Sequence, residues 1–331
     1  MTPSGFSLAV SASVCLVPSA STFDLRPAAA TEFDVVGYGE NSLDFLALTG
    51  AFPAPDTKTE LQTLEVQPGG QIATAVLAAA RLGCRARYVG AFGDDAWAAE
   101  IRAALSAGAV DVVAIERAGV STRTAVVIVD ATGRRTVLER RDPRLALGEG
   151  DVDPAVFQSA RILMLDATDV PGSIRAAAAA RSVGTRVMVD VETSVEGLEH
   201  LLGLADVVIA SAGFGGDAAP KPGAACVPAS GQVWITTVGE DGSVARDGGR
   251  EIRTAARAVS VRDTTGAGDV FRGAFAARWA AGGALDLEGL LDYAGAAAAL
   301  ACRALGAQGS LPTHAEVEQL LGAAAARGKS L

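Results

Sequence analysis

The segment that most restricts how this chain can fold lies in its last third, over residues 262–269. It reads Arg-Asp-Thr-Thr-Gly-Ala-Gly-Asp, which is too rich in glycine for a helix or a strand. Apolar residues follow at intervals of one helical turn, which predicts an amphipathic helix from Val270 to Trp279 with a stop at Gly282. The segment therefore leads into a helix N-terminus, where N–H groups without intrahelical partners and the helix dipole favour an anion.

This pattern places Asp269 in the first turn of the helix, beside the predicted anion site. An anion site there can stabilise charge on a group in transfer, while the carboxylate takes a proton from an attacking hydroxyl. The alternative interpretation is a plain helix cap, an aspartate that follows a glycine turn without any chemistry. The spacing alone leaves both interpretations open.

The same segment carries a family resemblance. Residues 263–269 resemble, letter for letter, the second signature of the ribokinase-like (PfkB-type) carbohydrate kinases. The resemblance implies that Gly266, Ala267 and Gly268 hold the phosphates in transfer and that Asp269 is the catalytic base. It also implies an α/β fold, a three-layer α/β/α sandwich with a mostly parallel central sheet and a small β-sheet lid.

The acceptor site is expected first where the strand predicted at Phe33–Gly37 ends. In ribokinase-like enzymes an aspartate that follows this strand binds sugar hydroxyls, so the resemblance assigns Asp44 to the acceptor, with Asn41 assisting. A turn residue is the alternative for Asp44. Residues 189–192 and 205–211, and the spacing from Asp56 to Gly69, resemble the ketohexokinase branch. In that branch an aspartate in the corresponding turn contacts the ketose, so the resemblance makes Asp56 a further candidate for contact with the sugar.

The family's first signature is matched in part, ahead of an alanine-rich helix expected at 72–82. Gly69 and Gly70 correspond to two glycines that approach the substrate, and Gln71 occupies another polar position. Thr74 stands where the family has an asparagine. A threonine can still donate and accept a hydrogen bond, but the substitution leaves the identity of the sugar open.

A lid is expected from three segments with strand periodicity. Residues 59–66 alternate roughly in the strand period, and 123–129 and 135–140 alternate on either side of a turn that contains Gly133, which predicts a hairpin. In the family such strands form a lid over the substrate, here about residues 44–67 and 120–141. Because family lids also form dimer contacts, we expect a homodimer through the lid.

From residue 151 onward strands and helices alternate, which predicts a parallel sheet with helices on both faces. Functional residues should collect at the carboxyl ends of its strands, where Asp166 and Asp190 lie. The family's usual Asn-x-x-Glu, which organises Mg²⁺, is absent after the strand at 207–210. Mg²⁺ would then be held by water and phosphate, or by Asp190 and Glu192.

The resemblance implies two further sites in the last third of the chain. One lines the nucleotide pocket and involves Thr237, Gly239 and Gly242, with Gly268 at the phosphates; without the family a plain hairpin would be the preferred interpretation. The other is a monovalent cation site, with K⁺ as the expected ion, near the anion loop. Its candidate residues are Asp263, Thr265, Ala301, Gly306 and Ser310.

The composition of the chain limits which partners and which cellular compartment are expected. The chain has 331 residues and a net charge of −10 without basic clusters, which disfavours nucleic acid as a partner. No apolar run reaches the length of a membrane span, and the four cysteines form no CxxC pair, so a reducing cytoplasm is expected. Residues 1–31 are expected to be a disordered leader rather than a signal peptide, because no Lys or Arg precedes their apolar run. A single kinase domain should span residues 32–325.

These observations favour an ATP- and Mg²⁺-dependent carbohydrate kinase that transfers the γ-phosphate to a sugar hydroxyl, with a small-molecule sugar as its partner. A nucleoside kinase of the same fold remains an alternative. A sugar-binding sensor without turnover is a second alternative, which the missing Asn-x-x-Glu motivates and the intact Asp269 opposes.

Overall fold

A nine-stranded sheet forms the centre of the computed structural model, which describes residues 32–214, 231–282 and 286–328. Its strand order is β13-β12-β11-β10-β9-β8-β1-β4-β5, and every pairing from β11 to β5 is parallel. The antiparallel pair at one edge is β12 (Ser243–Asp247) and β13 (Arg250–Thr254). The parallel strands are β1 (Phe33–Tyr38), β4 (Ala86–Gly93), β5 (Val110–Arg117), β8 (Ala160–Leu165), β9 (Arg186–Val191), β10 (Val207–Ser211) and β11 (Val233–Thr237).

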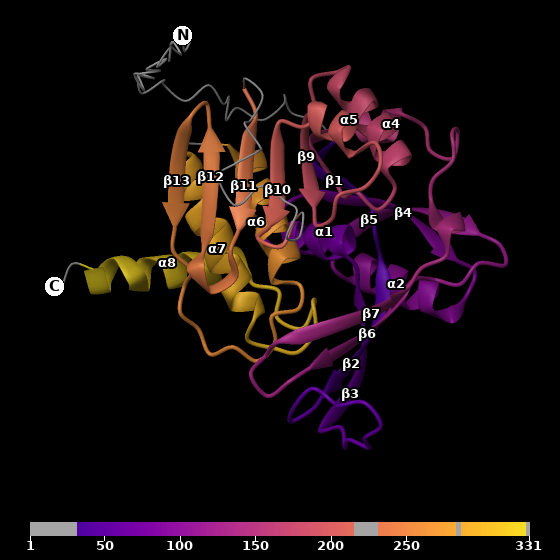
Figure 1. The fold of residues 1–331 in the computed structure, drawn as a ribbon. Helices are drawn as coiled ribbons and strands as arrows, with labels where there is room; N and C mark the ends of the chain where they lie inside the picture. Colours follow the sequence, from indigo (N-terminus) through magenta and orange to yellow (C-terminus); the bar gives the residue numbers. More distant parts are fainter. Residues whose placement is uncertain (1–31, 215–230, 283–285, 329–331) are drawn as a thin grey trace, which may run out of the picture.

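Helices cover both faces of this sheet (Figure 1). Neighbouring strand residues point to opposite faces, so that Val35 of β1 belongs to one buried apolar cluster and Val36 to the other. The first cluster lies under α1 (Gln71–Arg81), α2 (Ala96–Ala107), α6 (Ala267–Ala281), α7 (Leu287–Ala301) and α8 (His314–Gly328). The second lies under α3 (Ala155–Gln158), α4 (Val170–Arg181) and α5 (Leu198–Gly203). The predicted three-layer α/β/α sandwich is confirmed.

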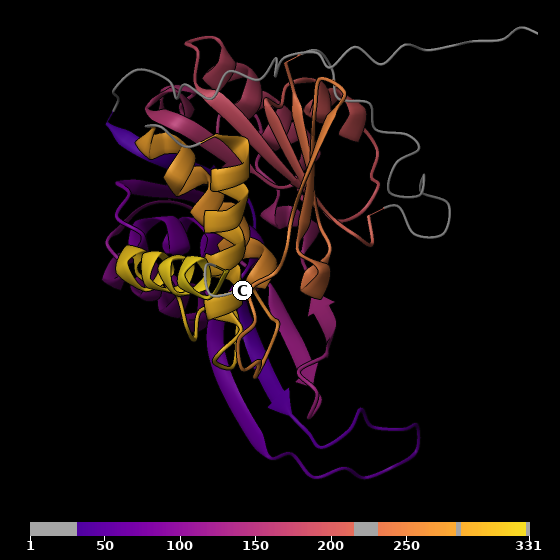
Figure 2. The same cartoon turned by 90° about the vertical axis from the view of Figure 1, so that its left-hand side faces the viewer.

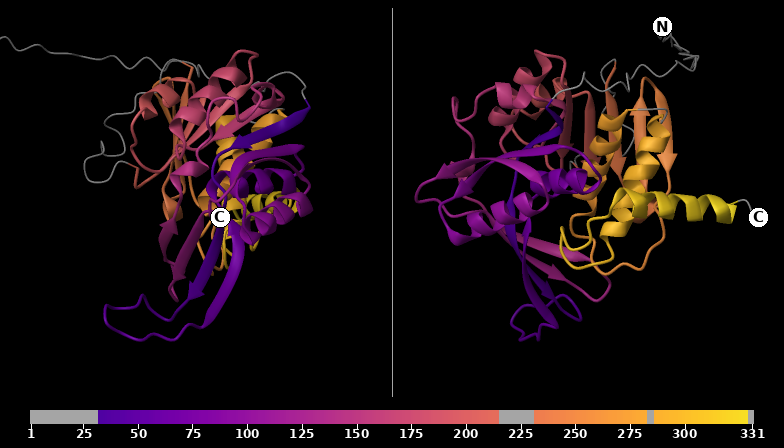
Figure 3. Two further views of the ribbon diagram at one scale, coloured as in Figure 1. Left: turned by 90° about the vertical axis from the view of Figure 1, so that its right-hand side faces the viewer. Right: turned by 180° about the vertical axis from the view of Figure 1, so that it is seen from behind.

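Small side chains let the helices of the first layer approach closely. These helices lie on the near side of the sheet in the view from behind (Figure 3). In α1 every residue from Ile72 to Ala79 is buried. A Cβ on Gly273 of α6 would lie 2.2 Å from the carbonyl oxygen of Ala75, so glycine is needed where α6 crosses α1. This crossing fixes the N-terminus of α6 at the carboxyl end of the sheet.

A second sheet of four strands, in the order β3-β2-β6-β7, projects from the body (Figure 2). It consists of β2 (Ser42–Leu48), β3 (Thr63–Gly69), β6 (Thr124–Val129) and β7 (Arg135–Arg140). Leu46 of β2 packs with apolar residues of β6 and with Leu305, which attaches this sheet to the segment after α7. The predicted hairpin and its union with the earlier strands are confirmed.

The first lid strand after β2 is displaced from its predicted place. Alternation predicted a strand at 59–66, but β3 runs from Thr63 to Gly69. Pro68 pairs with Leu43, and a proline is tolerated there because β3 is an edge strand whose outer side needs no N–H donor.

None of the helices in the described ranges is long and apolar enough to cross a membrane. Cys84 and Cys302 have free thiols. The expected leader, residues 1–31, lies outside the described residues.

Candidate active site

The glycine-rich loop forms the start of α6 as predicted. Gly266 caps the helix with a left-handed φ of 76°, and a Cβ there would lie 2.5 Å from the Cα of Ala307. Both facts require glycine at this position. The N–H groups of Gly268 and Asp269 have no backbone acceptor within the described ranges, and both residues are partly exposed. Unpaired donors at a helix N-terminus form an anion site.

Asp263 holds this loop in place. Its side chain is fully buried; one carboxylate oxygen accepts hydrogen bonds from the N–H and hydroxyl of Thr265, at 2.8 and 2.7 Å. The other accepts from the N–H of Gly306, at 2.8 Å. Asp263 therefore fastens the loop to the segment after α7, where the predicted cation candidates Gly306 and Ser310 lie. Binding of K⁺ by these residues, with Ala301 at the end of α7, stays a prediction.

Asp269 lies in the first turn of α6 and is 13% exposed in its side chain. Its Oδ1 accepts a hydrogen bond from Nη1 of Arg272, at 2.7 Å. Burial raises the pKa of Asp269 to about 7, although Arg272 acts to lower it. A carboxylate with this pKa, beside an anion site, fits the role of a general base.

Arg272 is a functional candidate that sequence analysis missed. It is 3% exposed and its Nη2 lies 2.6 Å from Asp190, at the carboxyl end of β9, and 3.8 Å from Glu192. The available signal was its spacing of three residues from Asp269 on the same helix, which brings two side chains together.

Asp44 and the two glycines of the first signature come together as expected. Asp44 is 6% exposed, and its Oδ1 accepts a hydrogen bond from the hydroxyl of Ser42, at 2.6 Å. A Cβ on Gly69 would lie 2.1 Å from Oδ2 of Asp44, and one on Gly70 would lie 2.4 Å from the Cα of Asn41. Asp44 also belongs to the charged groups that influence the pKa of Asp269.

Two of the other acceptor candidates, Asn41 and Thr74, form hydrogen bonds within the protein. The amide nitrogen of Asn41 donates to the hydroxyl of Tyr88, at 2.8 Å, and to the carbonyl of Ala91, at 2.9 Å. Thr74 is fully buried and accepts a hydrogen bond from Gln308, at 3.2 Å. Gln71 is the first residue of α1.

Asp56 is not brought to Asp44. It is exposed, with a left-handed φ of 59°, in the loop that joins β2 to β3. That loop forms the far end of the projecting sheet (Figure 2). Contact between Asp56 and a sugar stays a prediction.

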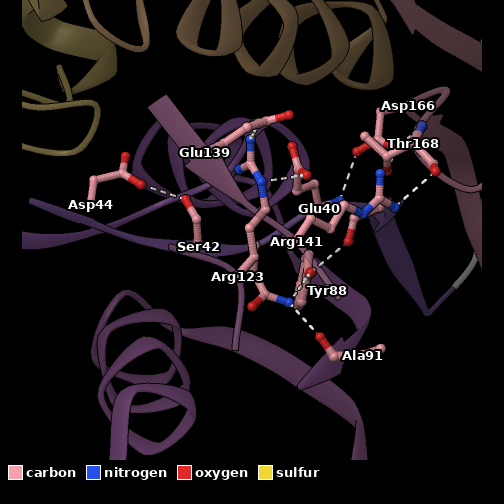
Figure 4. Close-up of polar contacts among 12 residues, drawn as sticks. Glu40, Ser42, Asp44, Tyr88, Ala91, Arg123, Glu139, Arg141, Asp166 and Thr168 are labelled. Atoms are coloured by element: carbon pink, nitrogen blue, oxygen red, sulfur yellow. Dashed lines mark hydrogen bonds and ion pairs between the residues drawn. The ribbon is translucent and has the colours of Figure 1, made fainter. Parts of the chain in front are cut away.

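A second charged cluster, which sequence analysis also missed, joins residues that follow β1 and β8 to Arg123, which precedes β6 (Figure 4). Glu40 is 9% exposed, and its carboxylate lies 2.7 Å from Nε of Arg123, which also pairs with Glu139. Burial raises the pKa of Glu40 to about 8. The predicted strand-end residue Asp166 accepts a hydrogen bond from the backbone N–H of Glu40, at 2.7 Å, so it joins the ends of β1 and β8.

The predicted nucleotide segment lies at the carboxyl end of the parallel strands. Thr237 ends β11, and Gly239–Asp241 forms a short 3-10 turn. Gly242 has a left-handed φ of 92°, and a Cβ there would lie 2.0 Å from the carbonyl of Thr254. The predicted strand and glycine turn are present. Nucleotide binding by Thr237, Gly239 and Gly242 stays a prediction.

Carboxylates able to assist Mg²⁺ are few. The described residues contain no group of three side chains arranged to hold a metal ion. Asp190 is paired with Arg272, which leaves Glu192, whose carboxylate lies 3.8 Å from Nη2 of Arg272 and whose side chain is about half exposed. This arrangement fits a Mg²⁺ ion that arrives on nucleotide phosphates and keeps most of its ligands as phosphate and water oxygens.

A three-layer α/β/α body, a projecting β-sheet and a carboxylate beside an anion loop define the ribokinase-like class of fold. Residues 32–314 match the pfkB family of carbohydrate kinases, and the chain belongs to this family. It is therefore a phosphotransferase that uses an alcohol group as its acceptor.

Relatives cover most of the chain. A nucleoside kinase of Methanothermobacter thermautotrophicus is 25% identical over 301 residues, which cover 86% of this chain and 94% of the relative. Fructokinase-1 of Oryza sativa subsp. japonica is 27% identical over 330 residues, which cover 87% of this chain and 97% of the relative. The crystal structure of a putative ribokinase II of E. coli, in complex with ATP and Mg²⁺, superposes with a TM-score of 0.73 at 19% identity. The superposition covers 88% of this chain and 99% of the E. coli chain.

Proposed function

We propose that the protein is an ATP-dependent carbohydrate kinase that transfers the γ-phosphate to a sugar hydroxyl. The observation that carries this proposal is Asp269, a carboxylate with a pKa of about 7 in the first turn of α6, beside unpaired N–H groups. Phosphoryl transfer requires positioning and neutralisation of charge above all, and this site supplies an anion hole and a base together.

In the proposed reaction the γ-phosphate lies at Gly266, Ala267 and Gly268. Asp269 takes the proton from the acceptor hydroxyl, the oxygen attacks phosphorus, and the bond to the β-phosphate oxygen breaks to release ADP. Mg²⁺ bound to the phosphates would neutralise their charge, with Glu192 as the protein carboxylate within reach. The binding of ATP and Mg²⁺ by the related E. coli protein supports these cofactors.

The acceptor is placed against Asp44, Gly69 and Gly70. Their close mutual approach leaves the Asp44 carboxylate beside backbone that carries no side chain, an arrangement suited to a polyhydroxylated ligand. Gln71, Thr74, Asn41 and Asp56 are the further residues proposed to shape this site. The fructokinase relative supports a sugar acceptor.

A nucleoside acceptor is the second candidate, and the nucleoside kinase from Methanothermobacter thermautotrophicus is the observation that favours it. The same base and anion hole would serve both acceptors.

A screen of ADP release tests the proposal. The purified protein would be assayed with Mg·ATP and K⁺ against ketoses, aldoses, keto-deoxy sugar acids and nucleosides, with Asp269→Asn beside it. Turnover on one sugar, lost in the variant, is the expected result. Turnover on nucleosides alone would show that the acceptor is a nucleoside rather than a sugar, with the proposed mechanism unchanged. Bound ATP without turnover on any acceptor would contradict the kinase and favour a sugar-binding sensor.

A further inference from the structure

The guanidinium of Arg272 connects three segments at the carboxyl end of the sheet. Its Nη1 donates to Asp269 at 2.7 Å, and its Nη2 lies 2.6 Å from Asp190 of β9. It also lies against the anion loop, because a Cβ on Gly268 would be 3.3 Å from Nη1 and 3.6 Å from both Cζ and Nη2. One planar group therefore touches the proposed base, the loop proposed to hold phosphate, and a strand of the central sheet.

The charges of this cluster explain why a cation is needed there. Asp190 and Asp269 are both largely buried, with 3% and 13% of their side chains exposed. Neither oxygen of Asp190 accepts a hydrogen bond of regular geometry within the described ranges, so Arg272 is its principal support. Removing one partner of a buried ion pair leaves an uncompensated charge. A phosphate at Gly268 would add further negative charge beside Asp269.

We propose that Arg272 is a positioning residue for phosphoryl transfer: anchored on Asp190, it orients the Asp269 carboxylate beside the anion loop and compensates the charge that Asp269 and the phosphate share. This inference rests on the proposed kinase function. It adds that Asp190 of β9 holds the Asp269 carboxylate in place through Arg272.

During transfer Arg272 exchanges no atom or proton. The acceptor proton moves to Asp269, the new O–P bond forms and the bond to ADP breaks, while Arg272 keeps its charge. Its two Nη groups fix the distance between α6 and β9, which a lysine cannot do because its ammonium is a single compact charge.

Arg272→Met and Arg272→Lys test the proposal, with Arg278→Met as the matched control. Arg278 is on the same helix, half-buried over the ring of Tyr293 and away from Asp269. We expect kcat to fall about a hundredfold in Arg272→Met and about tenfold in Arg272→Lys, with KM for ATP changed less than about twofold. Arg278→Met should retain the wild-type kcat.

A structural role alone would lower the unfolding temperature without this separation of kcat from KM. Should Arg272→Met fail to fold, the double variant Asp190→Asn/Arg272→Met removes both buried charges and restores the balance. The proposal requires the double variant to fold and still to lack most of its kcat. A double variant with wild-type kcat would overturn it.

A titration independent of turnover separates this inference from the kinase proposal. The carboxyl carbon of Asp269, assigned by its loss in Asp269→Asn, would be followed by carbon-13 NMR against pH. The charged groups that act on it are Arg272, Glu192, Arg135 and Asp44, with Asp190 behind Arg272.

Loss of the Arg272 charge should move the midpoint upward by about one unit or more in Arg272→Met, and Arg278→Met should leave it unchanged. An unmoved midpoint in Arg272→Met would overturn the role of Arg272, whether or not the wild type turns over any acceptor. Silence of the wild type on every acceptor would overturn only the kinase proposal.

Discussion

The protonation of Asp269 is set by two opposed influences. Burial disfavours its charged form and raises the pKa to about 7, while Arg272 and Arg135 stabilise the charge and Glu192 and Asp44 oppose it. Because the pKa is above the ordinary value for an aspartate, the basic form is lost as the pH falls through neutrality. A general base is useful only while deprotonated.

We therefore predict that kcat/KM rises with pH and reaches half its maximum near pH 7. Below that value it should fall about tenfold per pH unit, because each unit removes most of the remaining carboxylate. Initial rates between pH 5.5 and 8.5, with the coupling enzymes in excess, measure the profile. A profile that is flat across this range would contradict the assignment of Asp269 as base.

At this scale the sequence predicted the residues that stand in a signature, and missed those that meet only in three dimensions. Asp269, Gly266 and Asp44 are recognisable from their neighbours in the chain. Arg272 depends on Asp190, which lies 82 residues earlier, and Glu40 depends on Arg123. Buried ion pairs of this kind follow from tertiary packing, which no local pattern specifies.

At the scale of elements, the hairpin of β6 and β7 is fastened to the anion loop. Arg135 at the start of β7 donates to the carbonyl and to the hydroxyl of Thr264, at 3.3 and 3.1 Å. The hydroxyl of Thr264 donates in turn to the carbonyl of Gly133, at 3.2 Å. The projecting sheet and the loop that would hold phosphate therefore share a set of hydrogen bonds.

Thr264→Val, which keeps the shape but removes the hydroxyl, should lower kcat/KM by about five- to tenfold. The physical reason is the loss of two hydrogen bonds between the hairpin and the loop, each of modest net value. Thr136→Val, on an exposed position of β7, is the matched control. Steady-state kinetics of both variants test this prediction. The same kcat/KM in Thr264→Val as in Thr136→Val would show that the hairpin does not support the loop.

Elements were predicted well where periodicity and caps agree, and less well at their ends. The helix after the anion loop was predicted with its stop at Gly282, which is its C-cap. The alternation after residue 151 did not fix where each helix begins; α4 begins at Val170, where Asp169 caps the helix and Pro171 occupies its first turn. Strand β3 was displaced because an edge strand accommodates Pro68.

At the scale of the whole molecule, the outer face of the projecting sheet is apolar and open. The register aligns Val66 of β3, Phe45 of β2, Val126 of β6 and Leu138 of β7 in one row across the sheet. Leu138 is 58% exposed, and Leu64, two residues from Val66, is 62% exposed. An apolar surface of this kind marks an interaction site in many soluble proteins.

The homodimer expected from the sequence stays a prediction, and this face gives it a test. Leu138→Glu combined with Leu64→Glu should convert a dimer to a monomer, because two charges would be buried at the contact. Val183→Glu, at an equally exposed position between α4 and β9, is the control. Light scattering coupled to gel filtration gives the mass. A wild type that stays monomeric at about 100 µM, where even weak specific contacts associate, would contradict the prediction.

The architecture of the molecule was predictable because strand and helix alternate and one signature is intact. The acceptor was not predictable, because the site proposed for it is assembled from β2, the end of β3 and the start of α1, and the signature is altered at Thr74. Thr74 is fully buried and accepts a hydrogen bond from Gln308, 234 residues away. The surroundings of Thr74 therefore depend on a long-range contact, which no local sequence pattern specifies.

The measurement that tests the central claim most directly compares Asp269→Asn with the wild type in two assays. Calorimetry gives the affinity for Mg·ATP, and ADP release with the acceptor found in the screen gives kcat. The account predicts a loss of kcat of about a hundredfold or more, because asparagine cannot accept the proton, with ATP affinity kept within about twofold. A variant that keeps more than about a tenth of the wild-type kcat while binding ATP normally would contradict Asp269 as the base.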